Sequence, residues 1–228
     1  MAKLENSLKN MFLSLTVITV VVGALLGAVA YITAEPIKAT EAAAQKDAIK
    51  AVAPEFDAVS DPYVLEDCGN GLPATIFNVS KGDQVVGKAV EVVTKKGFGG
   101  KVKVMFGFDN EGNITGYNVL DCSNETPGLG SKMPDWFQEK AENGQTSKGV
   151  IGKNPGKSNL TVTKDGGEVD AITAATISSR AFCDAIALAW ASVSGTDATS
   201  GATSQVKEAA EKAAETVGDM VDAIQSEE

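Results

Sequence analysis

The chain has 228 residues, a formal net charge of −10, three cysteines and no histidine. The acidic balance argues against nucleic acid as a partner, because there is no basic patch to neutralise phosphates. The lack of histidine excludes His-based catalytic triads and removes the commonest metal ligand. The cysteines form no CxxC pair typical of zinc, haem or iron–sulfur binding, so no metal site is predicted. Redox chemistry supplied by an organic cofactor remains compatible with this composition.

Residues 11–33, MFLSLTVITVVVGALLGAVAYIT, carry no charge. At about 1.5 Å per residue, a helix of this length can cross a hydrocarbon core of roughly 30 Å. The apolar part of a cleaved signal peptide is normally only about 7–15 residues, so an uncleaved transmembrane anchor is favoured over that alternative. Lys3 and Lys9 before the segment, against Lys38 after it, favour a cytoplasmic N-terminus over residues 1–10. The sequence therefore predicts a single-pass protein of the cytoplasmic (inner) membrane with its main domain on the periplasmic, extracytoplasmic side.

The chain after the anchor is expected to begin with a membrane-proximal helical region, residues 34–72, that contains an alanine-rich helix over 40–53. Runs of β-branched residues then predict strands. The strands at 101–108 and 114–120 are expected to pair as a hairpin. An apolar stripe at helical spacing, starting with Ile177, predicts a final helix that ends at Val193. The other expected elements are strands at 74–79, 84–94 and 160–163, a short helix at 134–141, a loop at 143–158 and a glycine turn at 165–167.

These elements predict an α+β domain over residues 73–193, with an antiparallel sheet and flanking helices, preceded by one N-terminal transmembrane helix. Residues 194–228 are acidic and alanine-rich, and they are expected to form a linker and a tail that is helical or disordered.

The stretch VDAITAATISSR, residues 169–180, places Thr176 at the start of the final predicted helix. The first amides of a helix lack backbone partners and the helix dipole is positive there, so a phosphate is well placed at such an end. The alternative is that Thr173 or Thr176 is an ordinary helix N-cap, which this stretch alone favours. Around Thr176, small side chains leave space for a bulky group and hydroxyls add donors: Ala174, Ala175, Ser178 and Ser179.

A second motif, ETPGLG, lies upstream. Its proline and glycines allow the backbone to approach a flat ring closely, and its leucine can cover an apolar ring face. Its glutamate and threonine can supply polar contacts. Taken alone, the motif is also typical of a structural glycine–proline turn. Its residues are Glu125, Thr126, Pro127, Gly128, Leu129 and Gly130.

Together, the two motifs resemble those of the FMN-binding domain family, whose members include the G subunit of the Rnf complex and the C subunit of the sodium-translocating NADH:quinone reductase. The resemblance covers roughly residues 73–190 and the anchor, and the Rnf protein is the more similar of the two. The family's acceptor pattern is Asp, two residues, Ser or Thr, Gly or Ala, Ala, Thr, then an onward Ser or Thr. Ala174 stands in place of the more usual glycine. The positions of the pattern here are Asp170, Thr173, Ala174, Ala175, Thr176, and Ser178 or Ser179.

The resemblance implies that FMN is covalently attached through a phosphoester to Thr176 and that the ETPGLG loop contacts the flavin. It also implies that a flavin transferase using FAD recognises Asp170 and attaches the cofactor. The chain would then relay electrons in an ion-translocating oxidoreductase coupled to Na⁺ or H⁺ transport, without a catalytic site of its own. Its implied partners are the other membrane subunits of the complex, the transferase and membrane lipid.

Three alternatives remain open from the sequence. The chain could be the C subunit of the quinone reductase, a membrane-tethered flavin module that senses redox state outside any pump, or an unflavinylated adaptor. A second copy of the acceptor pattern, DATSGATS at residues 197–204, would place FMN on Thr203. The helix after Thr176 and the turn before Asp170 favour Thr176, because residues 197–204 are typical of a flexible linker.

Several other side chains are candidates for the site. Lys132, Lys153 and Lys157 could contact a phosphate, although solvated surface is the favoured interpretation for each. Cys122 precedes the flavin loop and is expected to be a small buried residue. Trp136 is favoured as a core residue over a stacking platform for the flavin ring.

Overall fold

The computed structural model describes residues 8–53, 55–82 and 84–194, so the predictions for the acidic tail and for Thr203 lie outside the described residues. Helix α1 runs over Leu8–Val52 and includes the predicted anchor and the alanine-rich helix that follows it. Within the described part of the chain, α1 is the one helix long and apolar enough to cross a membrane, with a mean hydropathy of 2.5 over its most apolar window. The folded domain begins at Asp47, near the end of this helix.

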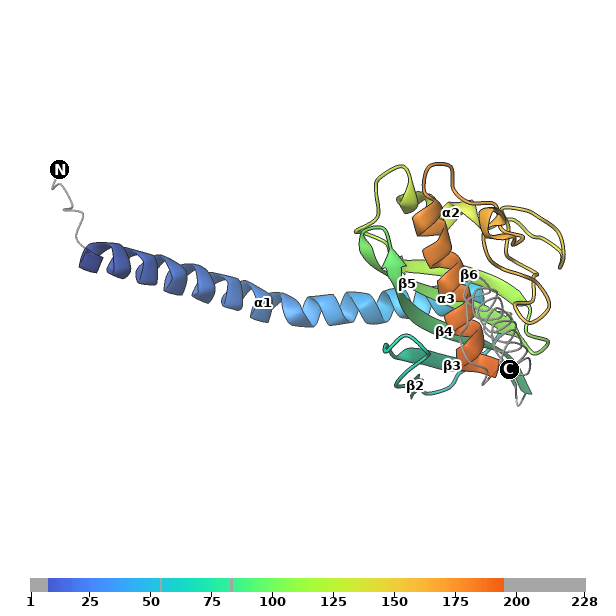
Figure 1. The fold of residues 1–228 in the computed structure, drawn as a ribbon. Coiled ribbons are helices and arrows are strands. Elements are labelled where there is room, and N and C mark those ends of the chain that lie inside the picture. The colour runs from blue at the N-terminus through green and yellow to red at the C-terminus, as the bar shows by residue number, and fades with distance from the viewer. Residues whose placement is uncertain (1–7, 54, 83, 195–228) are drawn as a thin grey trace, which may run out of the picture. The chain divides into compact units, whose positions relative to one another are not determined.

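The domain is built on a six-stranded antiparallel sheet (Figure 1). The strand order is β1-β3-β4-β5-β6, and β2 pairs with β3 beside β1. The predicted strands at 74–79, 84–94, 101–108 and 114–120 are confirmed as β3 to β6. The bounds are β1 Ala58–Val59, β2 Tyr63–Leu65, β3 Ala74–Lys81, β4 Gln84–Gly97, β5 Gly100–Asp109 and β6 Ile114–Asp121.

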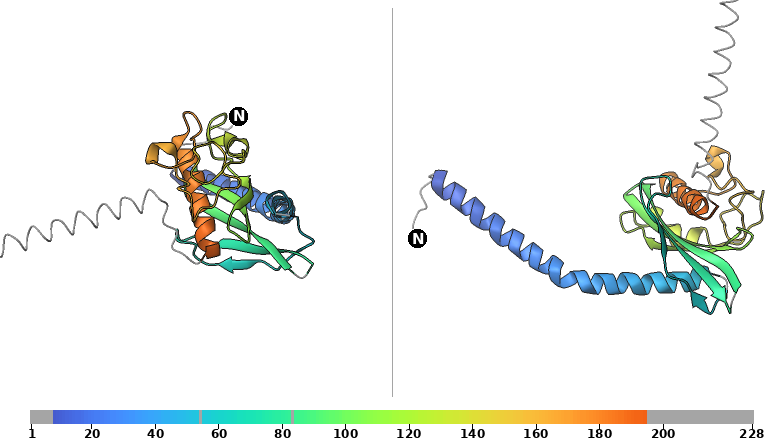
Figure 2. Two further views of the ribbon diagram at one scale, coloured as in Figure 1. Left: turned by 90° about the vertical axis from the view of Figure 1, so that its right-hand side faces the viewer. Right: turned by 90° about the horizontal axis from the view of Figure 1, so that it is seen from below.

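Alternating side chains on the central strands supply two apolar layers, because successive residues of a strand point to opposite faces. One face carries Val92, Val104 and Phe106 and is covered by α3, Thr176–Ser194 (Figure 2). The opposite face contributes Met105 and its neighbours to a smaller apolar cluster, which also contains the end of α1. The members of this cluster are Ala48, Ile49, Val52, Phe77, Val79, Ala89 and Met105.

The helix predicted at 134–141 is much shorter than expected. It is a single turn, α2 Met133–Trp136, preceded by the 3₁₀ turn η1, Gly130–Lys132. The buried Tyr117 hydroxyl accepts a hydrogen bond from Phe137 N at 3.1 Å and donates to Met133 O at 2.9 Å. These are the two backbone groups that a continuing helix would join, so the tyrosine ends the helix there.

Two further predictions about secondary structure differ from the structure. Residues 34–72 are helical only as far as Val52, after which β1 and β2 form. Residues 160–163 form no strand; Val162 makes an isolated bridge to Val169, and the 3₁₀ turn η2, Thr163–Asp165, follows. A short apolar run cannot reveal whether a partner strand will be present, which explains both differences.

The contact between α1 and the sheet depends on Gly107 of β5. A Cβ at this position would lie 2.0 Å from Val52 O, whereas a Cβ at Gly116 on the neighbouring strand would meet nothing closer than Val52 Cα at 3.1 Å. We expect Gly107→Ala to lower the free energy of unfolding by about 1–3 kcal/mol through overpacking, and Gly116→Ala to cost clearly less. Chemical denaturation of both variants checks this, and equal losses would contradict it.

Candidate functional site

The two sequence motifs meet at one cavity of about 320 Å³ beside the start of α3. The ETPGLG loop forms one part of its lining, and the β4–β5 hairpin tip contributes Phe98. The third part comes from residues 170–178, called the acceptor segment after the predicted role of Thr176. A larger hollow of about 1090 Å³ lies elsewhere on the domain and includes no residue of either motif. The smaller cavity is lined by Phe98, Thr126, Leu129, Gly130, Ala174, Ala175, Thr176, Ile177 and Ser178.

Glu125 joins the segments that surround this cavity. Its carboxylate is buried, with the residue only 3% exposed. Ser178 Oγ, in the first turn of α3, donates to Glu125 Oε2, and Gly99 N, at the hairpin tip, donates to Glu125 Oε1 at 3.2 Å. Glu125 does not line the cavity, so its carboxylate joins the loop, the hairpin and the helix outside the cavity surface.

Glycines make this close approach possible. A Cβ at Gly130 would lie 2.3 Å from Glu125 Oε2 and 2.5 Å from Ser178 Oγ. A Cβ at Gly97 would lie 2.5 Å from Glu125 Oε1. All three distances are below van der Waals contact, so a side chain at either glycine would displace the buried carboxylate.

The rest of the ETPGLG loop is a tight turn. Leu129 N donates to Thr126 O at 3.1 Å, and Gly128 N donates to Ser131 Oγ at 2.8 Å. Gly128 has a φ of 75°, which glycine adopts without steric cost. Pro127 and Gly128 are exposed at the turn, whereas the half-buried Thr126 and Leu129 line the cavity.

The acceptor segment reaches α3 through a strained turn. Ala174 has a φ of 62° and is the only non-glycine residue with positive φ among those described. This conformation costs an alanine about 1–2 kcal/mol, which gives a physical reason why glycine is the more usual residue at this position of the pattern. Ser179 braces the turn, since its Oγ accepts from Ile172 N at 2.9 Å and donates to Ala175 O at 3.0 Å.

Thr176 is the first helical residue of α3. Ala175 O accepts the first intrahelical hydrogen bond, from Ser179 N at 3.0 Å, so Ala175 occupies the N-cap position. The alternative that Thr173 or Thr176 is the N-cap is therefore wrong. The Thr176 side chain is half-buried at the cavity, beside the unpaired amides of the helix start.

Three residues of the site are missed by sequence reasoning. Ile177, the first residue of the predicted apolar stripe, is 49% exposed and lines the cavity. Phe98 is 66% exposed at the tip of the β4–β5 hairpin and lines the same cavity. Lys164, which no motif indicates, donates from Nζ to Thr176 Oγ1 at 3.3 Å. Periodicity cannot distinguish an apolar cavity wall from core, and the contact of Lys164 depends on the fold.

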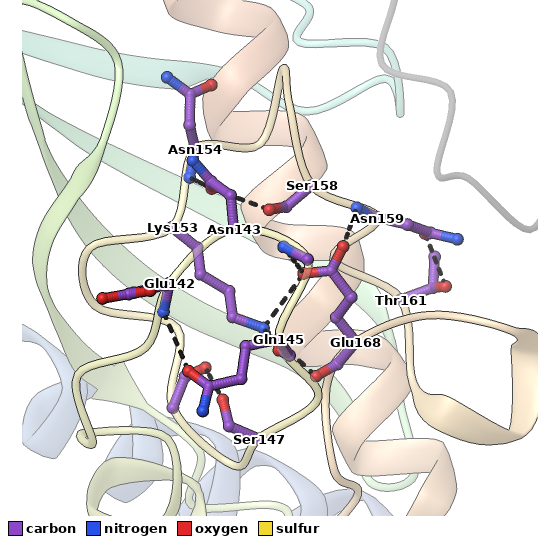
Figure 3. Close-up of polar contacts among 12 residues, drawn as sticks. Glu142, Asn143, Gln145, Ser147, Lys153, Asn154, Ser158, Asn159, Thr161 and Glu168 are labelled. Carbon is purple, nitrogen blue, oxygen red and sulfur yellow. Dashed lines mark hydrogen bonds and ion pairs between the residues drawn. The ribbon is translucent and has the colours of Figure 1, made fainter.

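A polar network stabilises the backbone that immediately precedes the acceptor segment (Figure 3). Lys153 is fully buried, which makes the surface prediction for it wrong. Its Nζ donates to the Gln145 carbonyl and to both the carbonyl and the carboxylate of Glu168, the latter two at 3.3 Å. Next to Glu168, Asp170 N donates to Ser147 O at 2.9 Å. These bonds fix the backbone immediately before the acceptor segment.

The other candidate side chains are placed as follows. Lys132 and Lys157 are exposed, as predicted. Cys122 is partly buried, and burial raises the pKa of its thiol. Trp136 packs partly buried against the main core and donates from Nε1 to Asp170 O at 3.0 Å, which links it to the acceptor segment as well.

The comparisons with known proteins identify the family of the domain. Residues 97–191 match the family model described as the FMN-binding domain, which includes the ETPGLG loop, the acceptor segment and most of α3. The class is therefore an FMN-binding domain, carried on a chain whose N-terminal helix is a candidate membrane span.

Similar proteins are named as the G subunit of an ion-translocating oxidoreductase complex. The Methanosarcina acetivorans protein is 32% identical over 188 residues, covering 80% of this chain and 92% of that protein. The Yersinia pestis protein is 35% identical over 136 residues, covering 57% of this chain and 61% of that protein. The Vibrio vulnificus protein is 29% identical over 196 residues, covering 79% of this chain and 87% of that protein. The chain belongs to this family of ion-translocating oxidoreductase G subunits, although it spans only about three fifths of the Yersinia pestis relative.

The junction at Glu125 can be tested with Ser178→Ala. This change removes the donor to Glu125 Oε2 and leaves a buried carboxylate oxygen without that partner. We expect the free energy of unfolding to fall by about 1–3 kcal/mol.

The matched control is Ser192→Ala in the same helix, whose Oγ donates back to Leu188 O at 2.8 Å and which should be close to neutral. Thermal and chemical unfolding of both variants provide the measurement. Equal stability of the two would show that Ser178 does not anchor Glu125.

Proposed function

We propose that this chain is the membrane-anchored flavoprotein subunit of an ion-translocating oxidoreductase, that it carries FMN covalently on Thr176, and that it relays electrons between other subunits. The observation that carries the proposal is the convergence of the ETPGLG loop and the acceptor segment at one cavity beside the start of α3. The family match over residues 97–191 supports FMN as the cofactor.

Thr176 is proposed as the acceptor on chemical grounds. Its hydroxyl is half-buried at the cavity and is not consumed by capping the helix. The first amides of α3 offer donors and partial positive charge to a phosphoryl group. The flexible side chain of Lys164 adds a full positive charge at the same oxygen.

The cavity walls suit an isoalloxazine ring. Phe98, Leu129 and Ile177 offer apolar surface, Ala174 and Ala175 are small, and Thr126 offers a hydroxyl. Ligand sites of this kind are mostly apolar with a few polar groups that fix orientation. When bound, FMN supplies the one-electron and two-electron redox chemistry that these residues lack. The protein's part is to hold the ring, shield its faces and keep the phosphate in place.

The remaining parts of the proposal concern the membrane and the partners. Residues 11–33 are proposed to span the membrane, with residues 73–193 as the extracytoplasmic FMN-binding domain. Other membrane subunits would donate and accept the electrons, and Na⁺ or H⁺ transport would be coupled to those steps. A flavin transferase is proposed to recognise Asp170, whose backbone is held in place by Ser147 and Trp136.

Mass spectrometry tests the covalent site. The full chain is expressed together with a flavin transferase, and the intact mass and the peptides are measured. We expect a gain of one FMN less one water, mapped to the Thr176 peptide and absent from Thr176→Ala. Thr203→Ala serves as the control and should be modified like the unaltered chain. A gain that maps to Thr203 would contradict the site, and no gain with a transferase active on a control substrate would contradict covalent attachment.

Protease accessibility tests the orientation. In intact spheroplasts, residues beyond Glu35 should be cleaved by protease added outside, while a cytoplasmic marker protein stays protected. Folded strands resist cleavage, so the assay should be read at the mostly exposed loop between β2 and β3, residues 66–73. Complete protection of the chain until the membrane is permeabilised would reverse the proposed topology.

A further inference from the structure

A single lysine side chain approaches the acceptor hydroxyl. Lys164 Nζ lies 3.3 Å from Thr176 Oγ1 and donates a hydrogen bond to it. Lys164 belongs to η2, twelve residues before Thr176, and so reaches the oxygen from a different element. The hydroxyl oxygen that would become the ester oxygen therefore already accepts a hydrogen bond from a cationic side chain.

An ion pair made by the next residue ties the turn that carries Lys164 to α3. This residue, Asp165, accepts two hydrogen bonds from Arg180, from Nε at 2.7 Å and from Nη2 at 2.6 Å. Arg180 lies one turn after Thr176 on α3, so this bidentate pair ties η2 to the helix start. Gly166 ends η2 with a φ of 81°, a conformation that glycine readily adopts.

Because Arg180 is paired with Asp165, the positive charge of Lys164 is available to an anion at Thr176. The Arg180 guanidinium is neutralised by Asp165, and it holds the pKa of that carboxyl below its usual range. No carboxylate forms an ion pair with Lys164 within residues 8–53, 55–82 and 84–194. The lining of the cavity itself contains no charged side chain. Lys164 therefore combines a direct contact with Thr176 Oγ1 and a charge that is available to an anion on Thr176.

We propose that Lys164 is the phosphoryl-binding residue of the flavin attachment site: it orients the Thr176 hydroxyl and pairs with the negative charge of the group transferred to it. This inference rests on the proposed attachment of FMN to Thr176. In the transfer, a bond forms between Thr176 Oγ and the flavin-side phosphorus of FAD, and the bond from that phosphorus to the oxygen of AMP breaks. The hydroxyl proton leaves with the AMP phosphate, nothing is oxidised or reduced, and the resulting diester keeps one negative charge opposite Lys164.

The three lysines that the sequence offered for phosphate contact do not compete for this role. Lys153 is buried and donates to Gln145 and Glu168. Lys132 and Lys157 are exposed, and among the described lysines Lys164 is the one that donates a hydrogen bond to Thr176 Oγ1. Lys157 therefore provides a matched control, since its removal changes the net charge equally without touching Thr176.

The test is the initial rate of FMN incorporation into the full chain, measured by flavin fluorescence of the denatured protein with FAD and purified transferase. Lys164→Gln should lower this rate roughly three- to tenfold, a range that allows for the solvent exposure of the lysine. Lys164→Glu should lower it further, Lys164→Arg should stay close to the unaltered chain, and Lys157→Gln should be unchanged. Raising the ionic strength should slow the unaltered chain more than Lys164→Gln.

Thermal unfolding of each variant separates charge from folding. A rate that follows the charge at position 164, with unchanged unfolding temperatures, supports the proposal. Equal rates for Lys164→Gln and Lys157→Gln would overturn it and leave the flavin site intact. Loss of rate in Lys164→Arg equal to that in Lys164→Gln would also overturn it, because only the packing of lysine would then matter. If the unaltered chain takes up no FMN on Thr176, both this inference and the proposed function fail.

Discussion

The buried carboxylate of Glu125 is the contact on which the arrangement of the site depends. It receives one hydrogen bond from the β4–β5 hairpin tip and another from the first turn of α3, while its own backbone begins the ETPGLG loop. A buried carboxylate without such donors would cost several kcal/mol, so these hydrogen bonds stabilise the contact between the three segments. Gly97 and Gly130 are glycines because the carboxylate occupies the space that a Cβ would need.

The elements around Glu125 each contribute a different contact to the site. The start of α3 presents unpaired amides and the Thr176 hydroxyl, and the strained turn at Ala174 brings that hydroxyl to the cavity. The Lys153–Glu168 network holds the segment from one side, and the Asp165–Arg180 pair holds η2 against the helix from the other. The domain can thus keep a phosphate fixed on rigid elements while apolar side chains at the rim remain exposed for a flat ring.

Much of this fold could be predicted from the sequence, because the strands β3 to β6 and helix α3 have clear periodicity and turn residues. The acceptor stretch and ETPGLG could be recognised as motifs, and the family comparison confirms that resemblance. Contacts between distant segments could not be predicted. The shortening of α2 by the Tyr117 hydroxyl, the burial of Lys153 and the approach of Lys164 to Thr176 each join residues that are at least eight positions apart. The place of Ile177 at the cavity could not be predicted either, because an apolar cavity wall and a core position share the same helical spacing.

The most direct test of the account is a crystal structure of the flavinylated chain. We predict density for a phosphoester on Thr176 Oγ at the start of α3, with the isoalloxazine ring against Phe98, Leu129 and Ile177 and the Glu125–Ser178 bond intact. A flavin attached at another residue, or a ring seated in the larger hollow beside Asn143 and Gly144, would contradict the claim that the two motifs form one flavin site.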